Sequence, residues 1–295
     1  MAGTALVLGG GGLTGIGWEI GMLAGLAEAG IDLTDADVVI GTSAGSIVGA
    51  HLTSGHFSLE GMYARQLAAP EARPGEGRAG GGRSGGSRPA ARMGPGSLAR
   101  FAAIALRSRN TVSFGARMGR LALAARTAPE AEQRAVIART LTIDDWPARR
   151  LMITAVDAAT GQRTAFDDAS GVGLVDAVAA SCAVPGVYPP VTLDGSRWID
   201  GGVHSSANAD LAAGYARVVV VAPMAVSGGP IDGPHSQGAR LARQGTRVCV
   251  ITPDRAARSA FGRNVLDPAK RADAARAGRR QSTAHAEKIH EVWAA

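Results

Sequence analysis

The sequence predicts an α/β fold built on a parallel sheet, and two observations lead to this prediction. In the first 60 residues, short runs of aliphatic and β-branched residues alternate with segments of helical periodicity, and the connections between them are short. Two further β-branched runs come late, "RVVVVAP" (217–223) and "TRVCVITP" (246–253). Parallel strands need crossover segments, and the helical segments can supply them.

The first half of the predicted fold follows from the order of these runs. "TALVLGG" (4–10) predicts a buried strand that ends at glycine. A helix is expected over 15–30, with Gly30 as its C-cap. "DVVIG" (37–41) predicts the second strand, and residues 43–54 the second helix. Strand, helix, strand and helix in this order are typical of βαβ units.

The middle of the chain changes character. Residues 70–97 are dominated by Gly, Pro, Arg and Ser and contain almost nothing to bury, which predicts a flexible insert. Residues 98–142 then have helical periodicity. "RLMITAVDAATG" (150–161) predicts a strand that runs into a turn, and residues 162–168 its hairpin partner.

The second half returns to alternating elements. Helical segments are expected over 173–183 and 207–215, and a short strand, "RWI" (197–199), lies between them. Segments rich in Ala and Arg continue as helices to residue 295. With no internal repeat and a late strand still adding to the sheet, we expect one domain over 1–295, in which residues 223–295 complete the fold.

The distribution of charge along the chain bears on which partners the protein could bind. The chain carries a net charge of +6; residues 1–64 contain no Lys or Arg, whereas residues 65–150 contain 16 Arg. A basic middle could approach anionic lipid head groups or nucleic acid, and a composition biased toward Ala, Gly and Arg would give the same count on an ordinary surface. No aromatic side chains interleave with these arginines for base stacking, so no nucleic acid is expected as a partner.

The cysteines and the start of the chain bear on localisation. Cys182 and Cys249 lie in apolar surroundings, which favours two buried free thiols over a disulfide framework or a metal cluster. The opening "MAGTALVLGG" has no charged lead, and no run of 18 apolar residues occurs, so neither a secretory signal nor a membrane span is expected. We predict a cytoplasmic protein, with peripheral contact with a membrane left open.

A glycine run, "LGGGGLTGIGWEIG", follows the first strand. The spacing of Gly10, Gly12 and Gly15 is that of a dinucleotide fingerprint, but the second strand ends without the acid that would hold a ribose. A P-loop would need a lysine, which residues 1–64 lack. Both observations weigh against a phosphate site and favour two other interpretations: a tight strand–helix turn, or main-chain amides at a helix N-terminus that hold an oxyanion.

A serine stands at the next strand–helix corner, in "GTSAG" (41–45). Gly-x-Ser-x-Gly between a strand and a helix is the pattern of a nucleophile elbow, in which Ser43 would be lifted clear of the sheet. A Ser–His–Asp triad would also require a histidine, and no histidine has a convincing setting, although His204 lies near a candidate acid. The six histidines are His51, His56, His204, His235, His285 and His290.

The candidate acid is Asp200, which the short strand delivers to a glycine turn, Asp200-Gly201-Gly202. A carboxylate held within hydrogen-bond reach of a serine can itself act as the general base. An ordinary Asp-Gly turn would have the same sequence. The residue alone therefore leaves both interpretations open.

Taken together, "GGGGLTG", "GTSAG" and "DGG", in that order, and "ASCAVPGVYPPV" ahead of the acid resemble the patatin-like phospholipase family over residues 5–222. The resemblance implies a three-layer α/β/α fold with a central, mostly parallel sheet. It implies a serine esterase that degrades lipids: a hydrolase that cleaves carboxylic ester bonds of phospholipids or related lipids. The implied partner is a lipid or a small ester, and no metal and no organic cofactor are expected.

The resemblance also implies roles for individual residues. Ser43 would be the nucleophile and Asp200 the base of a catalytic dyad. Gly10, Gly11 and Gly12 would supply the oxyanion hole, and the remaining motif glycines are Gly15, Gly41, Gly45, Gly201 and Gly202. One position departs from the family pattern, because Thr14 stands where an Arg or Lys is usual. An acyltransferase that uses the same acyl-enzyme, a lipid-binding protein without catalysis, and a nucleotide site at Gly10–Gly15 remain as alternatives.

Overall fold

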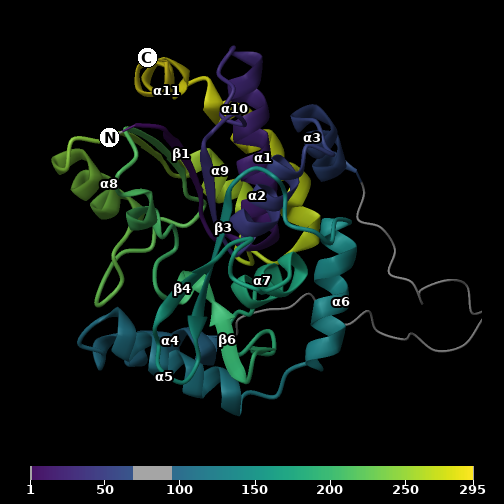
Figure 1. Cartoon of the computed structure of the whole chain (residues 1–295), viewed down its shortest axis with the longest axis vertical. Helices are drawn as coiled ribbons and strands as arrows, with labels where there is room; N and C mark the ends of the chain where they lie inside the picture. Colours follow the sequence, from purple (N-terminus) through teal and green to yellow (C-terminus); the bar gives the residue numbers. More distant parts are fainter. Residues whose placement is uncertain (1, 69–94, 295) are drawn as a thin grey trace, which may run out of the picture.

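The structure is a computed structural model that describes residues 2–68 and 95–294, in which one eight-stranded sheet is flanked by helices (Figure 1). The strand order is β5-β6-β3-β2-β1-β7-β8, and β4 pairs with β3. The parallel strands are β3 (Leu151–Asp157), β2 (Val38–Thr42), β1 (Thr4–Leu8), β7 (Arg217–Val221) and β8 (Arg247–Ile251). The antiparallel strands are β4 (Arg163–Phe166), β5 (Val191–Leu193) and β6 (Ser196–Asp200). The predicted α/β fold with a mostly parallel sheet is confirmed.

Both faces of the sheet are buried. Along β1, Leu6 and Leu8 enter one hydrophobic core, whereas Ala5 and Val7 enter a second core on the opposite face. This alternation follows from the two-residue period of a strand. The larger core is covered by α1 (Gly12–Glu28), α2 (Ala44–Ser54), α7 (Leu174–Ser181), α9 (Arg255–Phe261), α10 (Arg271–Ser282) and α11 (Ala286–Trp293). The smaller core lies under the 3₁₀ turn η2 (Ala209–Ala212) and α8 (Pro234–Arg243), which gives three layers.

The remaining helices lie around this core (Figure 1). They are α3 (Leu59–Leu67), α4 (Pro95–Leu106), α5 (Thr111–Ala124), α6 (Glu130–Leu141) and the 3₁₀ turns η1 (Gly201–Val203) and η3 (Pro268–Lys270). Most of the predicted insert over 70–97 lies outside the described residues, and its last three residues begin α4. Among the described residues, no helix combines the length and apolar character needed to span a bilayer.

The pairing of β3 brings two strand ends together. Thr154 pairs with Thr42, the last residue of β2, and the next residue, Ala155, pairs with Asp200, the last residue of β6. Because β4 pairs with residues 153–156, it occupies the other edge of β3. Thus β2 and β6 approach from opposite directions along one edge, and their carboxyl ends meet.

Three details differ from the sequence-based expectations. The helix predicted over 207–215 is wrong: it shortens to the turn η2, because Asn208 has a left-handed φ of 54° and Gly214 a φ of 93°. The Gly/Pro-rich stretch before His235 predicts a loop, but Gly233 and Pro234 instead form the N-terminus of α8, which contains His235. The unpredicted strand β5 pairs with β6 through a two-residue turn at Asp194-Gly195, where both φ angles are positive.

The C-terminal helix α10 packs on α1 at backbone distance. Glycines on both helices allow this approach: a methyl group on Gly21 would overlap the carbonyl oxygen of Ala275, and one on Gly278 would overlap that of Trp18. The Trp18 indole also donates to Gln281 Oε1 at 3.0 Å. Residues beyond 223 therefore complete the core that holds the first helix.

Candidate functional site

Ser43 occupies the corner between β2 and α2. Its backbone is in the left-handed region, with φ 51° and ψ −114°, and it is the N-cap of α2. Such a conformation costs about 1–3 kcal/mol in a non-glycine residue, so the surrounding contacts must hold it in place. The side chain is only 8% exposed and lies at the carboxyl end of the sheet, beside the positive end of the helix.

The flanking glycines make this corner possible. A side chain on Gly45 would overlap the carbonyl group of Leu8, and one on Gly41 would lie 2.6 Å from Cα of Ser46. The Gly45 amide donates to Gly9 O at 3.0 Å, which ties the corner to the glycine loop after β1. Both predicted motif positions therefore admit only glycine for steric reasons.

Asp200 lies at the end of β6 and is 6% exposed. Its amide donates to Ala183 O at 3.0 Å, and its Oδ1 accepts from the Gly202 amide at 2.7 Å. A side chain on Gly201 would overlap Thr154, so the turn after the acid needs glycine there. The predicted Asp-Gly-Gly turn is thus a 3₁₀ turn in which the Gly202 amide donates to the carboxylate.

The structure brings Ser43 and Asp200 together. Burial raises the pKa of the Asp200 carboxyl to about 6, and hydrogen bonds from the Ser43 side chain and the Gly202 amide oppose that rise in pKa. The carboxyl group is therefore ionised at neutral pH, while its base strength exceeds that of an exposed aspartate. A serine hydroxyl beside an ionised carboxylate of this kind can transfer its proton to the carboxylate.

The glycine loop after β1 lies beside the serine. A methyl group on Gly10 would be 3.5 Å from Cβ of Ser43. The Gly10 amide is occupied, because it donates to Ser206 O at 2.7 Å. Within the described part of the chain, the amides of Gly11 and Gly12 have no hydrogen-bond acceptor, and neither has the Ala44 amide at the start of α2. Of the three predicted oxyanion-hole glycines, Gly10 is thus the one whose N–H is unavailable.

Gly15 and Thr14 anchor the start of α1. The Gly15 amide donates to Gly11 O at 2.9 Å, and Gly15 packs against Pro223. Thr14 is fully buried; its amide donates to Val265 O at 3.1 Å, and its hydroxyl lies 3.4 Å from the same oxygen. Thr14, at the position where the family usually carries a basic residue, is therefore buried beneath the chain segment that contains Val265.

A tripeptide that the sequence analysis gave no role bridges the two predicted catalytic residues. Ser181 Oγ accepts from the Ser43 amide at 2.8 Å, Cys182 Sγ donates to Ser43 O at 3.4 Å, and Ala183 O accepts from the Asp200 amide. Burial raises the pKa of the Cys182 thiol to about 12, so it stays protonated and serves as a donor. The signal was present as "SCA" within the stretch that carried the family resemblance, but its contacts are not local.

Among the described residues, no histidine forms a hydrogen bond with Ser43. His51 Nε2 lies 3.1 Å from Leu141 O, and His235 Nε2 lies 3.3 Å from Thr252 Oγ1. His204 follows η1, and its Nδ1 is buried without a partner among the described residues. Burial and the nearby Arg163 lower the pKa of His204, which keeps its ring neutral.

A buried acid also lies behind the glycine loop. Glu19 of α1 is fully buried, and burial raises the pKa of its carboxyl well above the usual value. The nearby Gly9 amide acts against that rise in pKa, but it already donates to Val221 O at 2.9 Å. Neither Glu19 oxygen has a hydrogen-bond partner in the described structure, so the side chain is held neutral.

Fold and site together define a class: α/β proteins in which a serine after one parallel strand faces a carboxylate at the end of a neighbouring strand. The family model described as Patatin-like phospholipase matches residues 6–213, more than half of the chain. The chain belongs to the patatin-like phospholipase family, as the sequence motifs predicted. Membership implies a lipid acyl hydrolase.

Comparisons with individual proteins are more distant. The chain is similar to the crystal structure of VipD from Legionella pneumophila, with a TM-score of 0.46 and 12% identity over 99% of this chain and 67% of that chain. It is also similar to the crystal structure of the type III effector protein ExoU, with a TM-score of 0.38 and 15% identity over 98% of this chain and 53% of that chain. It thus spans about two thirds of the first and about half of the second. No curated protein sequence matches it.

Proposed function

We propose that this protein is a serine esterase that cleaves carboxylic ester bonds of phospholipids or related lipids through an acyl-enzyme on Ser43, with Asp200 as the base. The observation that carries the proposal is the pairing of β2 and β6 with adjacent residues of β3, which brings Ser43 next to the buried Asp200 carboxyl, so that the Ser43 side chain lowers the pKa of that carboxyl. Family membership supports lipid as the substrate class.

The reaction follows from these groups. Asp200 takes the hydroxyl proton of Ser43 as Oγ attacks the acyl carbonyl, and the carbonyl oxygen becomes an oxyanion. The free amides of Gly11, Gly12 and Ala44 are the available donors for this oxyanion, and one such donor contributes roughly 10²–10³ in kcat. The alcohol leaves with the proton from Asp200. Water then attacks the acyl-enzyme by the same route and releases the acid.

The decisive experiment is substitution of the nucleophile. Ser43→Ala should abolish hydrolysis of a short-chain ester and labelling by a fluorophosphonate probe while leaving thermal unfolding unchanged. Ser54→Ala, on the same helix but with side-chain hydrogen bonds only to His51 O and from the His56 amide among the described residues, is the matched control and should keep full activity. Retained hydrolysis by Ser43→Ala, or mapping of the probe to another serine, would refute the proposal.

Transfer to an acceptor other than water remains the second enzymatic candidate, because the acyl-enzyme is the same. Product analysis separates the two: hydrolysis gives free fatty acid in the presence of an acceptor alcohol, and transfer gives a new ester. The proposal expects free acid to dominate.

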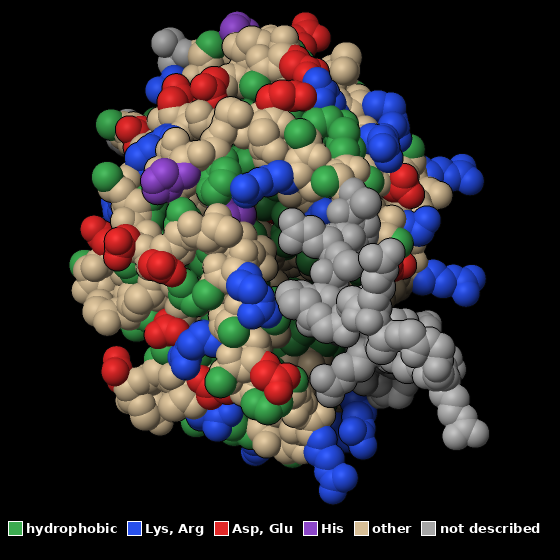
Figure 2. All heavy atoms as spheres, turned by 90° about the vertical axis from the view of Figure 1, so that its right-hand side faces the viewer, with side chains coloured by type: hydrophobic (Ala, Val, Ile, Leu, Met, Phe, Trp, Pro, Cys, Tyr) green, Lys and Arg blue, Asp and Glu red, His purple; other side chains and the backbone are tan. Residues whose placement is uncertain are grey.

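We further propose that the protein contacts lipid through the surface of α4 and α5. Residues 99–129 contain no acidic residue, and Leu106 is 87% exposed at the end of α4. Six arginines of this surface are exposed and form no salt bridge with a described residue: Arg100, Arg107, Arg109, Arg117, Arg120 and Arg126. Positive charge beside an exposed leucine fits an anionic bilayer. In the face shown in Figure 2, by contrast, basic and acidic side chains are interspersed.

The loop after β7 links the α4–α5 surface with the glycine loop. Gly229, in the loop after β7, faces Ala105 of α4, and the same loop provides Met224 O, which accepts from Ser206 Oγ at 2.8 Å. Ser206 in turn holds the Gly10 amide. A membrane bound at α4 and α5 would therefore bring its lipids close to the glycine loop.

A further inference from the structure

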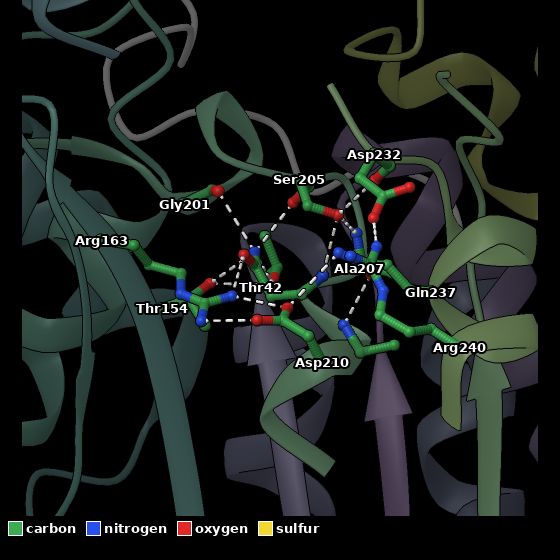
Figure 3. Close-up of polar contacts among 12 residues, drawn as sticks. Thr42, Thr154, Arg163, Gly201, Ser205, Ala207, Asp210, Asp232, Gln237 and Arg240 are labelled. Carbon is green, nitrogen blue, oxygen red and sulfur yellow. Dashed lines mark hydrogen bonds and ion pairs between the residues drawn. The ribbon is translucent and has the colours of Figure 1, made fainter. Parts of the chain in front are cut away.

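Asn208 lies, fully buried, in the loop that follows the Asp-Gly-Gly turn. Its side-chain nitrogen, Nδ2, is near four oxygens: Ser205 O at 2.8 Å, Thr42 Oγ1 at 3.0 Å, Gly201 O at 3.2 Å and Thr154 Oγ1 at 3.3 Å. Figure 3 shows these groups converging from separate elements. An amide nitrogen carries two protons, so the contacts are shared among the four acceptors.

The partners of Asn208 sit next to the reacting groups. Thr42 directly precedes Ser43, and Gly201 directly follows Asp200. Thr154 lies on β3 where the ends of β2 and β6 meet, and its hydroxyl is 2.8 Å from that of Thr42. One side chain thus connects both strand ends with the strand on which they meet.

A second layer of contacts sets the orientation of the amide. Arg163 Nη1 donates to Asn208 Oδ1 at 3.1 Å, and the guanidinium forms two hydrogen bonds with Asp210, of 2.7 and 2.8 Å. Because a guanidinium only donates, Asn208 must present its oxygen to Arg163 and its nitrogen to the strand ends. The ion pair lowers the pKa of Asp210, and Gln237 adds a contact to the same carboxylate at 3.4 Å.

We propose that Asn208 is a positioning residue that keeps Ser43 and Asp200 within proton-transfer distance by joining Thr42, Thr154 and Gly201 through one amide group. Among the described residues it forms no hydrogen bond with the serine hydroxyl or with the acid, and it acts through the residues beside them. The inference rests on the proposed function, because it assigns a geometric task within that reaction. A misplacement of about 1 Å at reacting groups can cost about 10²-fold in rate.

The test variant is Asn208→Gly, because glycine adopts the φ of 54° without strain while the amide is lost. We expect kcat to fall about 10²-fold with KM within about threefold, because substrate binding is left intact. The acid limb of the pH–rate profile should move upward, because a loosened Ser43 hydrogen bond no longer opposes the raised pKa of Asp200. Asn208→Asp, of equal shape but without the two donors, should lose kcat as well.

Two variants serve as controls. Arg163→Gln removes the group that orients the amide, so it should lose less than Asn208→Gly, and the double variant should be no worse than Asn208→Gly alone. Arg240→Gln breaks only the exposed ion pair with Asp232 in the same region and should leave kcat unchanged. All assays are run well below the unfolding temperature of each variant.

Amide hydrogen exchange tests the arrangement without catalysis. In Asn208→Gly, peptides covering 38–46 and 196–205 should both exchange faster, whereas in Arg240→Gln they should not. Unchanged exchange in both peptides, or a kcat within twofold of wild type, would overturn the proposal. If the proposed function is wrong, wild type and Ser43→Ala would hydrolyse esters equally. In that case the hydrogen-exchange result would still decide whether Asn208 holds the two strand ends.

Discussion

At the scale of single residues, two opposing effects set the chemistry of Asp200. Burial among the strand ends raises the pKa of its carboxyl to about 6, and hydrogen bonds from the Ser43 side chain and the Gly202 amide limit that rise in pKa. An exposed aspartate would be ionised but too weak a base, whereas one buried without partners would be neutral. The two donors keep the carboxyl ionised near pH 7 without removing its basicity.

This balance predicts the pH dependence of the reaction. Asp200 must be ionised to accept the proton of Ser43, so kcat/KM should be constant above pH 7 and fall about tenfold per unit below about pH 6. The measurement is ester hydrolysis from pH 4.5 to 8.5 under conditions in which the fold is intact. A profile that stays flat down to pH 5 would contradict the role of Asp200.

Stability provides the control for this profile. Because the pKa of Asp200 is raised in the folded state, folding is favoured by protonation and loses this contribution as the pH rises through about 6. Asp200→Asn, which has no charge to bury, should be inactive yet unfold at a higher temperature than wild type at pH 8. At pH 4.5 the difference in unfolding temperature should shrink.

The sequence indicated the proposed catalytic residues but not the residues that hold them. Ser43 stands between a strand and a helix within Gly-x-Ser-x-Gly, and Asp200 ends a short strand before Gly201-Gly202; both patterns are local signals. Ser181 and Asn208 carry no such signal, because their role consists of contacts with residues far away in the chain. The unavailability of the Gly10 amide likewise depends on Ser206, a distant residue.

At the scale of elements, α4 and α5 form a basic pair of helices beside the site. Asn110 begins α5 with a capping box to Ser113, so the corner after Leu106 is locally fixed. Phe114 and Met118 of α5 are buried against β3 and β6, which anchors the pair on the sheet. Leu106 and the exposed arginines of the α4–α5 surface therefore project outward from helices that are anchored on the sheet.

We predict that this surface sets lipid binding. Leu106→Ser combined with Arg107→Glu should reduce co-sedimentation with vesicles of 30% phosphatidylglycerol by about tenfold, since each basic residue contributes about 1 kcal/mol near an anionic surface. Hydrolysis of a water-soluble short-chain ester should remain unchanged. Vesicles of phosphatidylcholine alone are the control and should bind both proteins weakly.

An opposite result would be informative. Equal binding of wild type and double variant to the anionic vesicles would remove α4 and α5 as the lipid-contact surface. It would leave the assignment of Ser43 untouched, because that assignment depends on a different part of the fold.

At the scale of the whole molecule, the C-terminal segment packs against α1 and so supports the glycine loop of the candidate site. Helix α10 crosses α1 (Figure 1) at backbone distance. Val265 O accepts from the Thr14 amide at the start of α1, next to the glycine loop. These residues lie beyond 213, where the family match ends. The position of the loop therefore depends on a segment outside the recognised motifs.

We predict that Gly278→Ala destabilises the protein by about 1–3 kcal/mol, because the added methyl group would overlap the carbonyl oxygen of Trp18 and force α1 and α10 apart. Chemical denaturation would measure the change in the free energy of unfolding. Asp273→Ala, which removes only exposed ion pairs on the same helix, should change it by less than about 0.5 kcal/mol. Equal effects of the two variants would contradict close packing at this crossing.

The sequence by itself determined the class of fold, the two strand–helix corners and the glycine turn after Asp200, because strand periodicity, glycine positions and short connections are properties of neighbouring residues. Only the tertiary structure decided that β2 and β6 end at adjacent residues of β3, and that Ser181, Ala183 and Asn208 hold those ends. The physical reason is that strand pairing and buried hydrogen bonds join residues distant in the chain, and the pattern around any one of them does not contain its partner.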